Sequence, residues 1–164
     1  MSSIPISQEG YRLMKLELEN LKKQRPEVSE AIRLAREEGD LRENGGYHAA
    51  RERQGMMEAR ITFIKSRIAN YNVIDMRSLG GEQICFGATV ELEDGESGEK
   101  KRYVLLGPDE TGFCKGSVSV LSPVGQALLG KRVGDEVVIM VPRGRVEYEV
   151  LEIEFNGPAI AGAE

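Results

Sequence analysis

Apolar side chains recur at alternating spacings of three and four residues along the first half of the chain. The first series is Tyr11, Met14, Leu18, Leu21, Val28, Ile32 and Ala35, with Arg25 in the one missing place. The second series is Tyr47, Ala50, Met57, Ile61, Ile64, Ile68 and Tyr71, with Gln54 as its polar member. This spacing is that of the a/d seam of a coiled coil, so the pattern predicts two long amphipathic helices.

The two seams are arranged symmetrically about Leu41. Met14 and Ile68 lie at equal distances from Leu41 along the sequence, and so do Ala35 and Tyr47. Folding the chain back at this point would place every seam residue of the first helix opposite one of the second. An intramolecular antiparallel hairpin explains this symmetry better than two helices that each bind a separate partner.

Residues typical of helix ends bracket the first predicted helix. Ser7 is a preferred N-cap residue, and Gly39 suits the position just after a helix. Pro26 lies inside the helix and is expected to kink it or loosen one turn, because proline lacks a backbone donor. Asp40 stands three residues before Glu43, which is the spacing of a capping box, so Asp40 is interpreted as the start of the second helix.

Beyond about residue 80 the pattern changes to short runs rich in Val, Ile and Tyr, separated by glycine and proline. The expected strands are Ile84–Leu92, Lys101–Leu106, Ser117–Leu121, Glu136–Val141 and Arg145–Phe155, with one short helix over Pro123–Leu129. The predicted fold class is therefore α+β. We expect a coiled-coil hairpin domain over residues 1–78, a small α+β domain over residues 79–157 and a loose tail over residues 158–164.

Composition and charge narrow the possible functions. The chain is 40% hydrophobic and 30% charged, which allows a core but also indicates much exposed surface. Its net charge of −5 divides unevenly, because residues 1–78 hold 14 Lys and Arg against 12 Asp and Glu, and the rest hold 8 against 15. With no Trp and only 5% aromatic residues, the chain is not expected to bind nucleic acid freely or to stack bases.

The cysteines and the termini exclude further classes. Cys85, Cys114 and the single His48 cannot supply a four-ligand zinc site. Two thiols in a chain of this length suggest reduced cysteines rather than a disulfide scaffold. The chain shows neither a signal-peptide pattern nor an apolar run long enough for a membrane span, so we expect a cytoplasmic protein with no membrane contact.

The carboxylates of Asp40 and Glu43 have two explanations. Both acids are favourable as caps at a helix N-terminus, and the pattern alone favours this reading. Residues three apart also lie on one helix face, where two carboxylates can share a hard cation such as Mg²⁺. Alone they make a poor metal site, but they could complete a site on another molecule. Gly45 and Gly46 in the next turn cost about 2 kcal/mol relative to alanine, which stability alone would not favour.

Two separate stretches resemble the Gre family of bacterial transcript-cleavage factors, and within it the GreA type. The first comprises residues 35–44, AREEGDLREN, followed by residues 47–52, YHAARE. The second comprises residues 84–90, ICFGATV, residues 122–131, SPVGQALLGK, and residues 133–135, VGD. The resemblance runs from about Ile4 to Phe155, with the motifs in the same order and spacing.

This resemblance implies a fold, a partner and a site. The hairpin would enter the secondary channel of bacterial RNA polymerase, while an FKBP-like second domain docks at the channel's rim. Asp40 and Glu43 would help hold a second Mg²⁺, shared with the polymerase, and orient the water that cleaves backtracked RNA near its 3′ end. Arg36 and Arg51 would contact RNA phosphates or the channel wall. The chain would have no cofactor of its own and would act as an accessory factor rather than as an enzyme.

One departure and three alternatives stay open. The family usually has Ala and then an acidic residue where this chain has Gly45 and Gly46, so the strength of cleavage is not predicted. A relative that enters the same channel as an inhibitor would carry a denser acidic tip than one with Arg42 between two acids. An FKBP-like prolyl isomerase would need an aromatic pocket built from Phe86, Tyr103, Phe113, Tyr148 and Phe155. In a plain coiled-coil scaffold, the tip would be only a cap.

Overall fold

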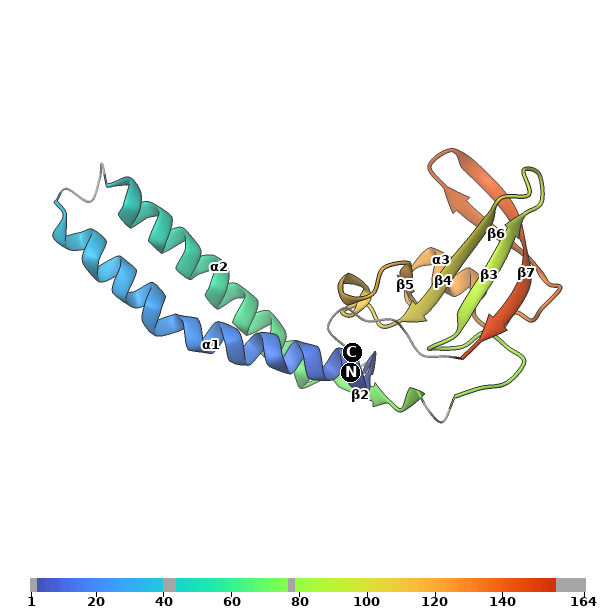
Figure 1. Cartoon of the computed structure of the whole chain (residues 1–164), viewed down its shortest axis with the longest axis horizontal. Coiled ribbons are helices and arrows are strands. Elements are labelled where there is room, and N and C mark those ends of the chain that lie inside the picture. The colour runs from blue at the N-terminus through green and yellow to red at the C-terminus, as the bar shows by residue number, and fades with distance from the viewer. Residues whose placement is uncertain (1–2, 40–43, 77–78, 156–164) are drawn as a thin grey trace. The chain divides into compact units, whose positions relative to one another are not determined.

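The computed structural model describes residues 3–39, 44–76 and 79–155, and its elements are shown in Figure 1. These residues form two compact units. One unit is Arg12–Asn70, and the other combines the chain up to Tyr11 with the chain from Tyr71 onward. None of the helices in the described part of the chain has the length and apolar character that crossing a bilayer requires.

Arg12–Asn70 is an antiparallel helical hairpin. Helix α1 (Gln8–Glu37) and helix α2 (Gly45–Ile68) run side by side in opposite directions (Figure 1). The predicted seam forms its core: a cluster of Val28, Ile32, Met57 and Ile61, against which Leu18, Leu21, Tyr47 and Ala50 pack. Each fully buried aliphatic side chain stabilises the hairpin by about 1.5–3 kcal/mol. The predicted fold-back of the two seams is confirmed.

Arg25, the polar residue of the first seam, is satisfied by an ion pair across the hairpin. Its guanidinium donates two hydrogen bonds to the carboxylate of Glu58, both 2.8 Å long. The hydrogen bonds from Arg25 lower the pKa of Glu58. Because both side chains are nearly half exposed, this pair contributes little to stability. Its effect is to let an arginine occupy a seam position without burying an unpaired charge.

The second unit contains a five-stranded mixed sheet. Its strands are β3 (Thr89–Asp94), β4 (Lys100–Leu106), β5 (Ser117–Ser119), β6 (Glu136–Val141) and β7 (Gly144–Glu154), in the order β5-β4-β3-β7-β6. Within this sheet β4 and β5 pair in parallel, and the other described neighbours pair antiparallel. A 3₁₀ turn, η2 (Thr111–Phe113), precedes β5, and helix α3 (Pro123–Leu128) begins after its N-cap Ser122. The α+β fold class is confirmed.

The start of the first predicted strand and the end of the third were wrong. The first strand begins at Thr89 rather than Ile84, because a turn precedes it in which Gly87 has a φ of +87°. A Cβ at Gly87 would lie 2.7 Å from the Met76 sulfur, so this side chain would have to shift to make room. The predicted third strand is shorter and ends at Ser119.

Strand β7 contains a bulge at Leu151. Glu152 pairs with Glu91 and Val150 pairs with Leu92, so Leu151 is the extra residue. Tyr148 and Val150, which precede the bulge, are buried on one face of the strand. The inserted residue shifts the face on which the following side chains lie.

A two-stranded parallel sheet was not predicted. Strand β1 (Ile4–Ser7) pairs with β2 (Tyr71–Ile74), in the register Ile4 with Tyr71 through Ser7 with Ile74. Both segments were expected within the hairpin domain of residues 1–78. In the structure they lie in the compact unit that contains the five-stranded sheet. Each strand is only four residues long, too short to show a period of its own.

Candidate functional site at the tip of the hairpin

The tip of the hairpin, the chain between Ala35 and Arg51, contains every site residue predicted from the sequence. Arg36 lies in the last turn of α1 and Arg51 in the second turn of α2, and both side chains are exposed. Asp40 and Glu43 lie outside the described residues. The structure therefore places the two arginines on the helices that flank the predicted acidic pair.

The cap of α2 is Asn44, not Asp40. Helix α2 begins at Gly45, and the side chain of Asn44 accepts a hydrogen bond of 2.9 Å from the backbone N–H of Tyr47. The prediction that Asp40 starts the second helix was wrong by four residues. Asparagine is as good an N-cap as aspartate, and a start at Gly45 keeps Tyr47 and Ala50 on the seam just as well. The Tyr47 amide therefore has its capping acceptor in Asn44 rather than in a carboxylate.

Asn44 also reaches the other helix. Its side-chain Nδ2 donates a hydrogen bond to the backbone carbonyl of Ala35, in the last turn of α1. The same carbonyl accepts from the amide of Glu38 at 3.3 Å. Carbonyls in the last turn of a helix lack the usual amide donor four residues further on, and Asn44 supplies an additional donor from across the hairpin. Sequence reasoning overlooked this residue, although an asparagine directly before a new helix is a recognised capping signal.

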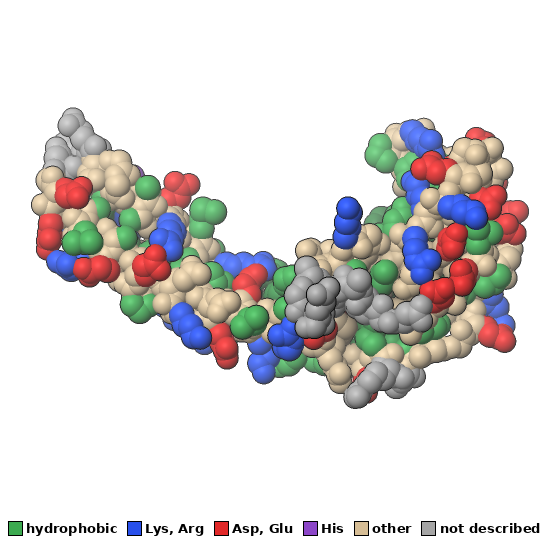
Figure 2. Space-filling model, in the orientation of Figure 1, with side chains coloured by type: hydrophobic (Ala, Val, Ile, Leu, Met, Phe, Trp, Pro, Cys, Tyr) green, Lys and Arg blue, Asp and Glu red, His purple; other side chains and the backbone are tan. Residues whose placement is uncertain are grey.

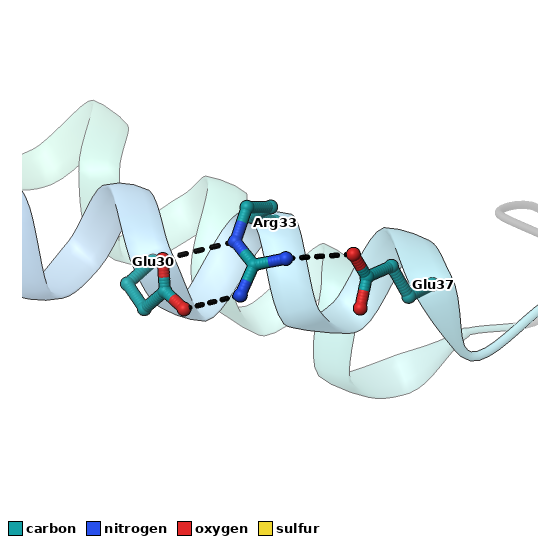
Figure 3. A network of polar contacts seen from close by, with 3 residues as sticks. All are labelled: Glu30, Arg33 and Glu37. Atoms are coloured by element: carbon teal, nitrogen blue, oxygen red, sulfur yellow. Dashed lines mark hydrogen bonds and ion pairs between the residues drawn. The ribbon is translucent and has the colours of Figure 1, made fainter.

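Several charges near the tip are neutralised within the protein. Arg33 donates to Glu30 at 3.0 Å and to Glu37 at 2.6 Å, as Figure 3 shows. The hydrogen bond from Arg33 lowers the pKa of Glu30. Arg53 lies 3.7 Å from a carboxylate oxygen of Glu27. These arginines fit the reading of a solvated helix face.

Arg36 and Arg51 differ from those arginines. Among the described residues, neither forms an ion pair with a carboxylate. The Arg36 guanidinium lies over the ring of Tyr47, 5.8 Å from its centroid, and Arg51 donates to the side-chain oxygen of Gln54 at 3.1 Å. The Tyr47 ring in turn meets His48 edge-on, with centroids 5.6 Å apart. Both guanidinium charges are thus positioned by neutral neighbours and can bind an anion.

Charge elsewhere on the hairpin is mixed. On the face shown in Figure 2, acidic and basic side chains are interspersed along the two helices. This agrees with the nearly balanced count of charges in residues 1–78. A mixed surface of this kind gives little general attraction for nucleic acid. Any contact with a phosphate chain is therefore expected to depend on a few placed arginines.

The described residues do not hold a metal site of their own. Within residues 3–39, 44–76 and 79–155, no group of three or more His, Cys, Asp and Glu side chains is placed to hold an ion. The donors that suit Mg²⁺ are carboxylate oxygens, and two carboxylates are what the metal accepts when phosphates or waters complete its shell. Asp40 and Glu43 therefore fit a shared Mg²⁺ in donor type but fall short of a complete site.

The isomerase alternative gains no support from the sheet unit. Phe86 and Tyr148, two of the five aromatic residues considered for a pocket, are buried in the core. A hollow of about 570 Å³ in this unit has a charged lining that includes Asp94, Glu136 and Arg143 and no aromatic side chain. A proline-binding pocket needs the opposite, an apolar lining with few placed polar groups.

Two family descriptions match the chain and together cover most of it. Residues 4–73 match the family "Transcription elongation factor, N-terminal", and residues 79–155 match "Transcription elongation factor, GreA/GreB, C-term". The first match contains the hairpin, the capping residue Asn44 and both flanking arginines. The second contains the five-stranded sheet.

Similar proteins align with this chain over nearly their full length. The transcription elongation factor GreA of Solidesulfovibrio magneticus is 63% identical over 161 residues, which is 98% of each chain. The GreA of Maridesulfovibrio salexigens is 62% identical, over 96% of this chain and 99% of its own. The crystal structure of GreA factor homolog 1 of Thermus thermophilus is 29% identical over 93% of this chain and 99% of its own, with a TM-score of 0.43. This chain belongs to the GreA/GreB family of transcription elongation factors.

Proposed function

We propose that this elongation factor stimulates the cleavage of backtracked RNA by bacterial RNA polymerase. In this proposal the hairpin enters the polymerase's secondary channel and brings its tip to the active site. Helix α1 has 30 residues, which at 1.5 Å per residue gives an arm about 45 Å long. The observation that carries the proposal is the capping of α2 by Asn44. Because Asn44 provides the acceptor for the Tyr47 amide, Asp40 is not needed as that cap and can act on a ligand.

Two carboxylates and two arginines at the tip would have different roles in cleavage. Asp40 and Glu43 would donate carboxylate oxygens to a Mg²⁺ held jointly with the polymerase and would orient the attacking water. The metal would stabilise the attacking and leaving oxygens of the phosphodiester. Arg36 and Arg51 would bind phosphates of the extruded RNA, because their charges are not neutralised by a carboxylate among the described residues. The factor would supply groups to the polymerase's reaction and would perform no reaction alone.

A cleavage assay tests this function directly. Polymerase stalled in a backtracked state, with its RNA labelled, is incubated with Mg²⁺ in the presence and absence of the factor. Faster shortening of the RNA supports the proposal, whereas no acceleration overturns it. Slower shortening would instead support the alternative of an inhibitor that occupies the same channel.

A double variant separates catalysis from binding. Asp40→Asn with Glu43→Gln should preserve folding and polymerase binding but abolish stimulated cleavage. Competition between this variant and the wild-type protein would show that it still occupies the polymerase. If the double variant cleaves like the wild type, the carboxylates have no catalytic role and the tip is only a structural cap.

A further inference from the structure

We propose that Asn44 is a positioning residue, whose bridge between the last turn of α1 and the first turn of α2 holds these two helix ends in the arrangement on which stimulated cleavage depends. This inference rests on the proposed function and deepens it. The bridge joins the carbonyl of Ala35 to the amide of Tyr47 through a single side chain. Residues 36–43 connect those two helix ends. The bridge therefore holds the last turn of α1 to the first turn of α2.

The two hydrogen bonds assign the Asn44 amide group without ambiguity. A backbone N–H can only donate, so the atom facing Tyr47 must be the side-chain oxygen. A backbone carbonyl can only accept, so the atom facing Ala35 must be the side-chain nitrogen. Few side chains satisfy both ends at once. An ionised Asp can accept from the Tyr47 amide but has nothing to donate to Ala35, whereas Ser or Thr would have to serve both partners with one hydroxyl that lies closer to the backbone than the Asn44 Nδ2 does.

Both ends of the bridge are held by the hairpin core. Ala35 is 8% exposed, and Tyr47 packs against the cluster formed by Val28, Ile32, Met57 and Ile61. The ring of Tyr47 also lies under the guanidinium of Arg36. Because Ala35 and Tyr47 are both packed in the hairpin core, the hydrogen bonds of Asn44 link one helix end to the other.

The start of α2 is weak without this residue. Its first turn contains Gly45 and Gly46 and no acidic side chain, so it lacks both intrinsic helix propensity and dipole compensation. Two glycines cost about 2 kcal/mol relative to alanine, while an N-cap side chain contributes about 1 kcal/mol. Asn44 thus offsets a substantial share of the cost at the start of α2.

The test uses the variant Asn44→Ser, which separates the cap from the bridge. Serine keeps an acceptor for the Tyr47 amide but removes the side-chain N–H that donates to Ala35, and its hydroxyl is held closer to its own backbone than Nδ2 is. The matched control is Asn70→Ser at the opposite end of α2, where the Asn70 amide donates to the Ser66 carbonyl at 2.9 Å. Both variants undergo the same chemical change and lose one hydrogen bond to a carbonyl near a helix end. They differ in their distance along α2 from the tip.

The readout is stimulated RNA cleavage across a range of factor concentrations, with hydrogen exchange of the Tyr47 amide to confirm that the cap persists. We expect Asn44→Ser to keep the wild-type half-saturating concentration but to lose on the order of tenfold to 100-fold in rate at saturation, as for misplaced reacting groups. Asn70→Ser should cleave at the wild-type rate. A wild-type rate at saturation for Asn44→Ser would overturn the inference, and so would an equal loss in the control.

The same experiment distinguishes this inference from the proposed function. The wild-type protein and the Asp40→Asn, Glu43→Gln double variant are run alongside. If the wild type accelerates cleavage, the double variant does not, and Asn44→Ser behaves as the wild type, only the role of Asn44 is refuted. If the wild type itself gives no acceleration, the proposed function fails and the positioning role fails with it.

Discussion

The backbone amide and the hydroxyl of Ser7 both donate hydrogen bonds to the carboxylate of Glu110, which lies 103 positions further along the chain. The Ser7 hydroxyl oxygen also accepts from the Gly10 amide at 3.0 Å, so Ser7 caps α1 as the sequence predicted. The amide of Gly107 donates to Glu110 at 3.0 Å, and the Glu110 residue is 0% exposed. A single buried carboxylate therefore ties the start of α1 to the turn after β4.

Removing this carboxylate should destabilise the unit that contains the sheet. Glu110→Ala would leave the amides of Ser7 and Gly107 buried without an acceptor, at about 1–3 kcal/mol each. Glu110→Gln retains a carbonyl oxygen for these donors, and its amide can donate to the Ser7 hydroxyl. We expect a loss of at least about 2 kcal/mol for Ala and a much smaller loss for Gln, measured by urea unfolding. Equal losses would show that these hydrogen bonds contribute nothing beyond packing.

The stability of the wild type relative to Glu110→Gln should fall as pH rises. Burial raises the pKa of Glu110, against the opposing hydrogen bonds from Ser7 and Gly107, and the nearby charge of Asp109 raises it further. A pKa raised above the unfolded value of about 4.3 means that the protonated acid favours the folded state. This contribution is fully present below the unfolded pKa and is lost as pH rises through the folded pKa.

Urea unfolding of both proteins between about pH 4 and about pH 7 would measure this difference. Glutamine cannot ionise, so subtracting its profile isolates the titration of Glu110. Glu96→Gln, the same chemical change at an exposed position of the same unit, is the control. A difference between wild type and Glu110→Gln that stays constant with pH would contradict the prediction.

Alanine should stabilise the protein at two glycines and destabilise it at a third. A Cβ at Gly45 or Gly55 would meet no atom within 4 Å, and neither residue has a positive φ. Gly55→Ala, inside α2, should raise the free energy of unfolding of the hairpin by about 1 kcal/mol, and Gly45→Ala, at the first position of the helix, by less. A Cβ at Gly107 would lie 1.9 Å from the Pro5 carbonyl oxygen, so Gly107→Ala should destabilise instead. Thermal unfolding of the three variants would measure each sign.

Neutralising Arg36 and Arg51 should weaken stimulated cleavage. Each residue is expected to bind an RNA phosphate. In the double variant Arg36→Gln with Arg51→Gln, the slope of the logarithm of the half-saturating concentration against the logarithm of the salt concentration should therefore become shallower by about 0.7 per lost contact. Arg33→Gln is the matched control, because Arg33 is already paired with Glu30 and Glu37. An effect of Arg33→Gln as large as that of the double variant would indicate a general charge effect rather than placed contacts.

The amino-acid sequence by itself determined the hairpin and the fold class. The seam repeats every three or four residues over several turns, and its symmetry about Leu41 leaves one way to bury both stripes in a single chain. The same local logic identified Ser7 as the cap of α1 and most strands of the sheet. These features follow from the sequence because each depends on neighbouring residues and on burying an apolar face.

Only the tertiary structure decided where α2 starts, how β1 and β2 pair, and what Glu110 binds. Asp40 and Asn44 have nearly equal capping preference, and Asn44, the cap in the structure, also donates to the Ala35 carbonyl across the hairpin. Strands β1 and β2 are four residues each, and Ser7 and Glu110 are 103 positions apart. Such contacts leave no local pattern, because the partner of each group is brought to it by the fold and not by its neighbours in the chain.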